Sequence, residues 1–246
     1  MYSEDPSSVA EAKTGGGGHH AAGQSLATLL VGSGVIAWLT HYNLQQRSVW
    51  SPPSSPIPYS WDEYLVVNTT LLALPALLLI LAGFKQSPWA FGLRPPEART
   101  ARVVWFFYIL MLPVLWLAAH RPDFQAQYPL FHSAANSWAA LAAYEITYGF
   151  YLFCWEFFYR GFLTFGIARG WGSTAGVVLQ AVGFGLMHLG KPTPEFLSSF
   201  PGGLIMGWLA LRTRSFLPGF ALHWAISATL DLLVIAVRHA GLIHIG

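Results

Sequence analysis

Two residues of opposite charge, Glu156 and Arg160, lie four positions apart inside a long apolar stretch of the chain. Between Asn136 and Ala168 the only other residue with a formal charge is Glu145. A charge near the centre of a membrane helix costs roughly 2.5–3.5 kcal/mol on insertion scales, so such residues persist where they pair or face a polar cavity. Side chains at i and i+4 share one face of a helix and can touch. The pair therefore indicates a membrane-embedded functional site rather than a passive membrane span.

Polar positions of this kind recur along the C-terminal half of the sequence. His188 follows Phe184 by four residues, and His223 is followed by Ser227 one helical turn later. A carboxylate and two imidazoles around one cavity can activate a water by general-base catalysis. They can also hold a divalent metal such as zinc, which lowers the pKa of a bound water. The residue types leave both mechanisms open, and in the second Glu156, His188 and His223 would be the metal ligands.

Two common hydrolase motifs do not account for these positions. The sequence contains no His-Glu-x-x-His motif, so a zincin-type site is excluded. Ser227 has His223 one turn away, but no strand-turn-helix nucleophile elbow surrounds it and no third orienting group is evident. Cys154, the single cysteine, lies two residues before Glu156 and is expected to pack elsewhere on the helix surface.

The composition is that of a polytopic membrane protein. Of the 246 residues, 54% are hydrophobic and only 10% are charged, whereas soluble domains average about 25% charged residues. The net charge of +2 is too small to indicate a nucleic-acid partner. The partner that the composition predicts is the lipid bilayer.

Seven apolar segments are candidate membrane helices, which need about 20 residues each. They cover residues 25–42, 65–84, 103–119, 137–168, 173–189, 195–211 and 216–237. The sequence therefore predicts an all-α fold, a transmembrane bundle of about seven helices (six to eight) within a domain over residues 25–246. Residues 1–24 contain a run of four glycines and paired histidines, cannot bury an apolar core, and are expected to form a disordered tail.

The basic residues of the connections predict an orientation. When the seven segments alternate in direction, eight basic residues collect on one side and four on the other, with Arg160 inside the bundle. Cytoplasmic loops carry the excess of Lys and Arg, so we expect a cytoplasmic N-terminus. The same arrangement places His188 and His223 near opposite membrane faces, unless residues 173–211 include a short or re-entrant pair of helices.

The polar positions together resemble a known family. Trp-Glu-Phe-Phe-Tyr-Arg-Gly at 155–161, Phe184-x-x-x-His188 and His223-x-x-x-Ser227 are similar to the motif series of the CPBP family. Its members are the CAAX-processing and bacteriocin-processing intramembrane proteases, also called the Abi group. The resemblance covers about residues 137–237 and implies hydrolysis of a peptide bond in a membrane-associated protein or peptide substrate, such as C-terminal or leader processing. It also implies a multi-pass protein of the bacterial inner membrane.

The resemblance implies a role for each matching residue. Glu156 and His188 would activate the water, while His223 and Ser227 would stabilise the oxyanion of the tetrahedral intermediate. Arg160 would orient the carboxylate of Glu156 and keep it ionised. The family has been described both as metalloproteases and as metal-free glutamate proteases, so a bound metal stays an open alternative.

Two positions depart from the family pattern, which reads Glu-Glu-x-x-x-Arg, Phe-x-x-x-His and His-x-x-x-Asn. Trp155 replaces the first glutamate, and Ser227, which can still donate a hydrogen bond, replaces the asparagine. Glu156 then serves alone unless Glu195 or Glu145 supplies the missing carboxylate. For Glu195 the favoured interpretation is a helix N-terminal charge stabilised by the macrodipole. Glu145 can equally be a polar contact between helices.

Two other functions compete with the protease. Trp155 in place of a glutamate agrees with a catalytically inactive membrane scaffold or immunity protein related to the same family. Intramembrane Glu and His residues also form proton relays, as in small transporters. No internal inverted repeat is visible in the sequence to support a carrier.

Overall fold

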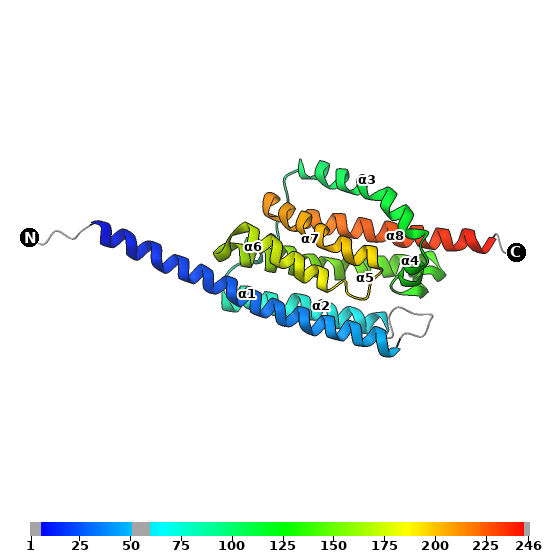
Figure 1. Cartoon of the computed structure of the whole chain (residues 1–246), viewed down its shortest axis with the longest axis horizontal. Coiled ribbons are helices and arrows are strands. Elements are labelled where there is room, and N and C mark those ends of the chain that lie inside the picture. Colours follow the sequence, from blue (N-terminus) through cyan, green and yellow to red (C-terminus); the bar gives the residue numbers. More distant parts are fainter. Residues whose placement is uncertain (1–5, 51–59, 244–246) are drawn as a thin grey trace, which may run out of the picture.

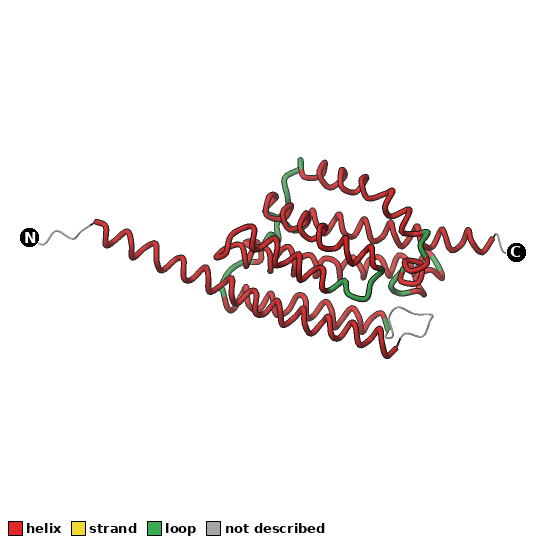
Figure 2. The backbone as a smooth tube through the Cα atoms, viewed as in Figure 1, coloured by secondary structure: helices red, strands yellow, loops and turns green. Residues whose placement is uncertain are grey.

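The computed structural model describes residues 6–50 and 60–243, and this part of the chain is helical with short connections and no strand (Figure 1 and Figure 2). Seven of its helices have eighteen residues or more. They are α1 (Pro6–Trp50), α2 (Trp61–Leu78), α3 (Thr100–Ala119), α5 (Trp138–Glu156), α6 (Thr164–Leu186), α7 (Thr193–Thr213) and α8 (Leu217–Ile243). The predicted all-α bundle of about seven helices is confirmed.

Shorter helical pieces extend or connect these helices. The π-helical turns η1 (Leu79–Gly83) and η4 (Phe157–Leu163) prolong α2 and α5. The short helix α4 (Pro122–Gln127) and the 3-10 turns η2 (Pro88–Phe91) and η3 (His132–Asn136) lie in the connections. Helices α1 and α2 lie along one side of the bundle and α3 and α8 along the other, with α5 between them (Figure 1).

Helix α6 consists of two parts that meet at Gly172. This residue has φ 84° and ψ 163°, a conformation that glycine adopts without steric cost. Beyond it the chain folds back, since a Cβ on Gly176 would lie 2.5 Å from the carbonyl oxygen of Thr164. The second part, residues 173–186, is about 21 Å long at 1.5 Å per residue, which is shorter than the ~30 Å hydrocarbon core of a bilayer. His188 therefore follows a helix too short to cross, which agrees with the predicted alternative of a short helix in residues 173–211.

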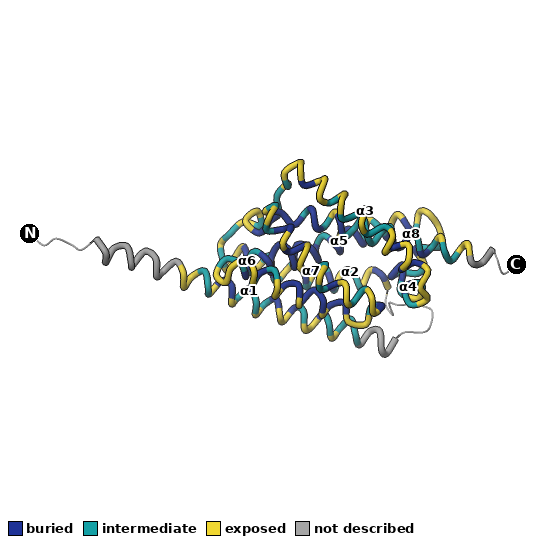
Figure 3. The backbone as a smooth tube through the Cα atoms, turned by 45° about the horizontal axis from the view of Figure 1, so that its top comes forward, coloured by how far each residue is buried: buried dark blue, intermediate teal, exposed yellow. Residues whose placement is uncertain are grey.

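The helices are buried on their inner faces and exposed on their outer faces (Figure 3), and many of the exposed side chains are large and apolar. Large exposed side chains include Leu30, Val66, Phe106 and Ile146, as expected for a surface that contacts lipid. By length and composition, four helical stretches of the described chain can cross a membrane. They are residues 18–44, 61–83, 100–119 and 217–240.

The N-terminal helix begins earlier than the sequence predicted. Helix α1 covers residues 6–24, where a disordered tail was expected, whereas residues 1–5 lie outside the described part. The hydroxyl of Ser25 donates to the carbonyl of Ile167 at 2.8 Å and accepts from the N–H of Gly170 at 2.9 Å. Ala21 also packs directly on Gly170, where a Cβ would not fit. The structure differs from the predicted tail most clearly at its end, where residues 21–25 of α1 are held against α6.

Candidate active site

Glu156 and Arg160 form a buried ion pair where α5 passes into η4. Nε of Arg160 lies 3.2 Å from Oε2 of Glu156, and both side chains are 0% exposed. The guanidinium also lies over the ring of Phe184, with its Cζ 3.9 Å from the ring centroid. The two side chains thus pair as their spacing predicted, inside an apolar shell that keeps water away from both charges.

The second oxygen of Glu156 joins α5 to His223 on α8. Nδ1 of His223 lies 2.7 Å from Oε1 of Glu156. An ionised carboxylate only accepts hydrogen bonds, so Nδ1 carries the proton and donates it. Gly219, one turn before His223, makes the close approach possible, because a Cβ there would lie 3.2 Å from Oε2 of Glu156. Nε2 of His223 is thereby left for other partners.

His188 lies in the turn that follows α6, with its ring orientation fixed by the backbone. Its Nδ1 lies 2.8 Å from the carbonyl oxygen of Phe184. A carbonyl cannot donate, so Nδ1 is the protonated nitrogen and, in the neutral ring, Nε2 is an acceptor. The ring is 7% exposed and is enclosed by Phe184 and by Trp155, whose ring stands edge-on to it. His188 therefore presents an unprotonated nitrogen from a rigid position.

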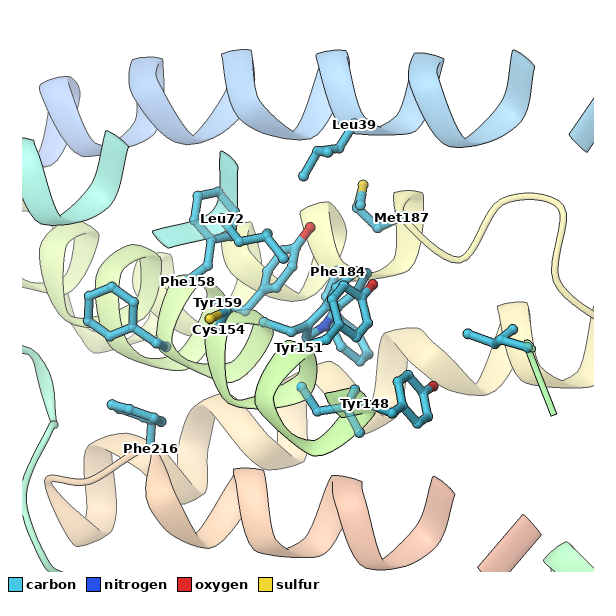
Figure 4. Close-up of a cluster of buried hydrophobic side chains, with 14 of the residues drawn as sticks. Leu39, Leu72, Tyr148, Tyr151, Cys154, Phe158, Tyr159, Phe184, Met187 and Phe216 are labelled. Atoms are coloured by element: carbon cyan, nitrogen blue, oxygen red, sulfur yellow. The ribbon is translucent and has the colours of Figure 1, made fainter. Parts of the chain in front are cut away.

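His188 and His223 line one cavity of about 50 Å³, which has room for a few water molecules. Other side chains in its lining include Tyr128, Tyr148, Tyr151, Trp155, Lys191, Glu195 and Ser227. Figure 4 shows Tyr151 of α5 near Phe184, with Met187 on one side of them and Tyr148 on the other, in the cluster of buried side chains that adjoins this cavity. The structure brings together two histidines that alternating, fully crossing helices would separate.

A second charged cluster borders the cavity at the start of α7. The hydroxyl of Tyr128 donates to Oε1 of Glu195 at 2.5 Å, and Nζ of Lys191 lies 3.1 Å from the same oxygen. Lys191 also donates to the Tyr128 hydroxyl at 2.5 Å. Burial, with the nearby charge of Glu195, raises the pKa of the Tyr128 phenol well above its usual range, so the phenol stays protonated. Oε2 of Glu195 has no hydrogen-bond partner among the described residues.

The remaining predicted residues fall into two groups. Ser227 belongs to the cavity lining, as does Trp155, whose buried indole N–H has no partner among the described residues. Glu145 lies apart from the cavity lining and interacts with Asp231 across the contact between α5 and α8. Cys154 is buried in the core, as a packing residue would be.

The sequence reasoning missed several residues that border the cavity. Tyr64, Tyr128, Tyr148 and Tyr151 are four of ten tyrosines, and nothing in their spacing separates them from the other six. Lys191 did carry a recognisable pattern, since it precedes Glu195 by four residues, the spacing of a helical ion pair.

The proposed metal ligands do not form a metal site in this arrangement. Among the described residues, no three side chains of His, Cys, Asp or Glu are grouped so that they could hold a metal ion. Glu156 is engaged by Arg160 and His223, while Nδ1 of His188 is turned to the backbone. Nε2 of His188 and of His223 remains without a partner among the described residues at the cavity, but Glu156 lies outside the cavity lining, so the three side chains do not converge on one shared point.

The comparisons with known proteins agree with the motifs. Residues 137–229 match the family model described as type II CAAX prenyl endopeptidase Rce1-like. No curated protein and no solved structure matches the chain significantly. The matched segment contains Glu156, Arg160, His188, His223 and Ser227. The match confirms the resemblance to CAAX proteases that the motifs of these residues indicated. The chain is thus an integral membrane protein whose residues 137–229 match the family model of Rce1-like type II CAAX prenyl endopeptidases.

Proposed function

We propose that the protein is an intramembrane endopeptidase that hydrolyses a peptide bond in a membrane-associated protein or peptide. One observation carries this proposal. Two imidazoles with fixed tautomers, His188 and His223, line one cavity large enough for water, inside the segment that matches a peptidase family.

In this proposal His188 holds the attacking water. Its Nε2 is a hydrogen-bond acceptor because Nδ1 is committed to the Phe184 carbonyl. A water bound at Nε2 is held in place with a lone pair free to attack the carbonyl carbon of the substrate. As the oxygen attacks, the water loses one proton to a base that lines the cavity.

His223 stabilises the charge that develops on the substrate. Its Nδ1–H bond to Glu156 fixes the orientation of the ring, and in the imidazolium form Nε2 donates a hydrogen bond to the oxyanion of the tetrahedral intermediate. The hydroxyl of Ser227 supplies a second donor from the same helix. When the carbon–nitrogen bond breaks, the proton taken from the water passes to the leaving amine, and the products are an amine and a carboxylic acid, which then releases its remaining proton to solvent.

Glu156 and Arg160 act on the reaction through His223 in this mechanism. Glu156 does not line the cavity, its Oε1 is bonded to His223, and its Oε2 faces Arg160 in an ion pair without a hydrogen bond, so it is a positioning residue. Arg160 balances its charge where water is excluded. This role differs from direct activation of water by Glu156, which the family resemblance implied.

The substrate class follows from the surroundings of the cavity. The outer faces of the bundle are apolar, so a substrate that approaches between the helices has to be membrane-associated. A C-terminal peptide that carries a prenyl chain is the first probe, because the matched family is described as a CAAX prenyl endopeptidase. Placement in a bacterial inner membrane with a cytoplasmic N-terminus is part of this proposal.

The test uses the purified full-length protein in liposomes. A fluorogenic farnesylated CAAX peptide and the same peptide without its lipid are supplied, and the cleavage site is read by mass spectrometry. We expect His188→Ala to lower kcat/KM by about 100-fold or more, the usual contribution of a positioned acid–base group. Wild-type cleavage by His188→Ala would refute the proposed mechanism. Comparing membrane and secreted proteins of cells with and without this variant would then identify the natural substrate by its unprocessed termini.

His120 provides a matched control for this variant. Its Nδ1 also lies 2.8 Å from the carbonyl oxygen of the residue four positions earlier, Trp116, but the side chain is exposed and outside the cavity. His120→Ala should therefore cleave both peptides at the wild-type rate. A loss in both histidine variants would indicate damage to the bundle rather than to the site.

A second candidate is a catalytically inactive membrane scaffold or immunity-type protein. Trp155 favours it, because a bulky indole occupies the cavity lining at the position where the family pattern has a glutamate. This function would hold if Glu156→Ala, His188→Ala and His223→Ala all kept full biological activity in cells.

A further inference from the structure

The buried ion pair of Glu156 and Arg160 does not supply the base that takes the proton from the water. A general base has to lie within hydrogen-bond reach of the proton that it removes. Glu156 is 0% exposed, is bonded to His223 through one oxygen and is paired with Arg160 through the other. It is also absent from the cavity lining. Another carboxylate is required to act on a water beside His188.

Glu195 is the carboxylate that lines the cavity together with His188. Its two oxygens have different surroundings. Oε1 receives the hydroxyl of Tyr128 at 2.5 Å and Nζ of Lys191 at 3.1 Å. Oε2 has no exposed surface and no hydrogen-bond partner among the described residues. Buried polar atoms are almost always satisfied, so we expect Oε2 to pair with a water of the cavity that Glu195 lines, which a small rotation of the carboxylate toward the cavity allows.

The chain between α6 and α7 explains why Glu195 reaches this position. Gly190, with φ 82°, turns the chain after His188, and Pro192 precedes the first residue of α7. Glu195 then falls in the first turn of α7, one helical turn beyond Lys191. Tyr128 reaches the same point from the end of α4, 67 residues away in sequence. The carboxylate is thus fixed by one short connection and one distant side chain.

We propose that Glu195 is the general base of the reaction, with Tyr128 and Lys191 as positioning residues, an inference that rests on the proposed peptidase function. One proton of the water passes to Oε2 of Glu195 while the water oxygen bonds to the substrate carbonyl carbon. The other hydrogen of the water is held by Nε2 of His188. When the carbon–nitrogen bond breaks, Glu195 returns its proton to the leaving nitrogen and is regenerated as a carboxylate.

The opposing interpretation is that Glu195 serves only to anchor the α6–α7 connection. The contacts of Oε1 with Tyr128 and Lys191 alone would satisfy that role. The two roles differ in what Glu195→Gln changes, because glutamine keeps the size of the side chain and an oxygen that can accept from Tyr128. If Glu195 is only an anchor, Glu195→Gln should lower the stability of the protein and leave its rate of peptide cleavage unchanged. If Glu195 is the base, the variant should lose cleavage and keep most of its stability.

The experiment compares Glu195→Gln with the wild-type protein on the farnesylated CAAX peptide in liposomes. We expect kcat to fall by about 100-fold or more, with KM changed less than about threefold and the unfolding temperature close to that of the wild type. Glu63→Gln is the control, since Glu63 is also an acidic residue in the first helical turn, of α2, but is exposed and outside the cavity. This control should keep both kcat and the unfolding temperature.

Chemical rescue supplies a second readout. Glu195→Ala opens space in the cavity for a small carboxylate, so added formate should raise its cleavage rate several-fold, whereas His188→Ala should not respond. Tyr128→Phe, which keeps the aromatic ring, should lower kcat by a smaller factor than Glu195→Gln at unchanged KM. These variants test the role of the carboxylate even when glutamine at position 195 impairs folding.

The outcomes separate this inference from the function on which it rests. Full activity of Glu195→Gln alongside an inactive His188→Ala would overturn the role of Glu195 and leave the peptidase in place. If the activity of Glu195→Gln falls together with its unfolding temperature, and formate does not rescue Glu195→Ala, Glu195 serves only as an anchor of the α6–α7 connection. If the wild-type protein cleaves neither the farnesylated peptide nor the peptide without its lipid, both proposals are refuted.

Discussion

Nδ1 of His223 donates to Oε1 of Glu156 across 2.7 Å, and this bond ties α8 to α5 at the edge of the cavity. The other oxygen of Glu156 faces Arg160 at 3.2 Å. One carboxylate therefore orients an imidazole that borders the cavity and balances a guanidinium that is 0% exposed. Substitutions of Glu156 should affect catalysis through the first contact and stability through the second.

Glu156→Gln should reduce kcat by about 100-fold or more while KM changes little. Glutamine keeps the shape of the side chain but replaces the charged acceptor of the His223 Nδ1–H bond with a neutral one, which weakens the bond that orients the ring. Steady-state cleavage of the farnesylated peptide in liposomes measures this. A rise in KM with unchanged kcat would instead place Glu156 in substrate binding.

The stability effect can be separated from catalysis by a double variant. Glu156→Ala leaves Arg160 as a buried charge without its carboxylate, which should cost about 3–5 kcal/mol of unfolding free energy. Glu156→Leu combined with Arg160→Met should recover much of that loss, because replacing both partners of a buried ion pair with apolar side chains is often neutral. Denaturant unfolding in detergent micelles measures both, and the double variant should stay inactive.

The exposed ion pair of Glu97 and Arg99 serves as the control for these variants. Its side chains are 68% and 75% exposed, so Glu97→Ala should leave the denaturant midpoint nearly unchanged. Equal loss of stability in Glu156→Ala and Glu97→Ala would contradict a special role for the buried pair.

Gly219→Ala should lower activity about tenfold with a small change in the unfolding temperature. The added Cβ would lie 3.2 Å from Oε2 of Glu156, so the carboxylate has to shift by a few tenths of an ångström, and with it the bond to His223. A misplacement of this size in a catalytic arrangement is expected to be costly. Gly202→Ala on α7 is the matched control, since its added Cβ would meet nothing within 4 Å. Equal activity in the two glycine variants would show that the Glu156–His223 contact tolerates such a shift.

Metal chelation should leave peptide cleavage unchanged. Glu156 lies outside the cavity that His188 and His223 line, and the described residues include no group of three side chains suited to a metal ion. Activity after treatment with 1,10-phenanthroline, together with elemental analysis of the purified protein, tests this. Loss of activity that returns on addition of zinc would refute the metal-free mechanism and require the three side chains to rearrange.

The sequence predicted the helices and the central polar residues because both leave strong local patterns. Apolar stretches of membrane length are evident in a chain with 10% charged residues, and a charged pair such as Glu156 and Arg160 is conspicuous within them. The i,i+4 spacing then determines that the two side chains meet, since this follows from helix geometry alone.

The parts that the sequence did not predict depend on contacts between distant segments. The turn at Gly172 shortens the second part of α6 and brings His188 to the level of His223, but one glycine among 24 does not disclose its φ angle. The bond from Tyr128 to Glu195 likewise joins residues 67 positions apart. Without that contact, Glu195 is indistinguishable from an ordinary acidic residue at a helix N-terminus.

Trp155→Glu should restore part of the activity that Glu195→Gln removes. Trp155 and Glu195 line the same cavity from α5 and α7, and the indole is far larger than a glutamate side chain, so a carboxylate at position 155 would have room beside the water. We expect Trp155→Glu with Glu195→Gln to cleave the farnesylated peptide at least tenfold faster than Glu195→Gln alone. Trp155→Gln with Glu195→Gln opens the same space without a charge and should show no recovery. Equal rates in the two double variants would mean that the cleavage rate depends on the space opened at position 155 and not on a carboxylate placed there.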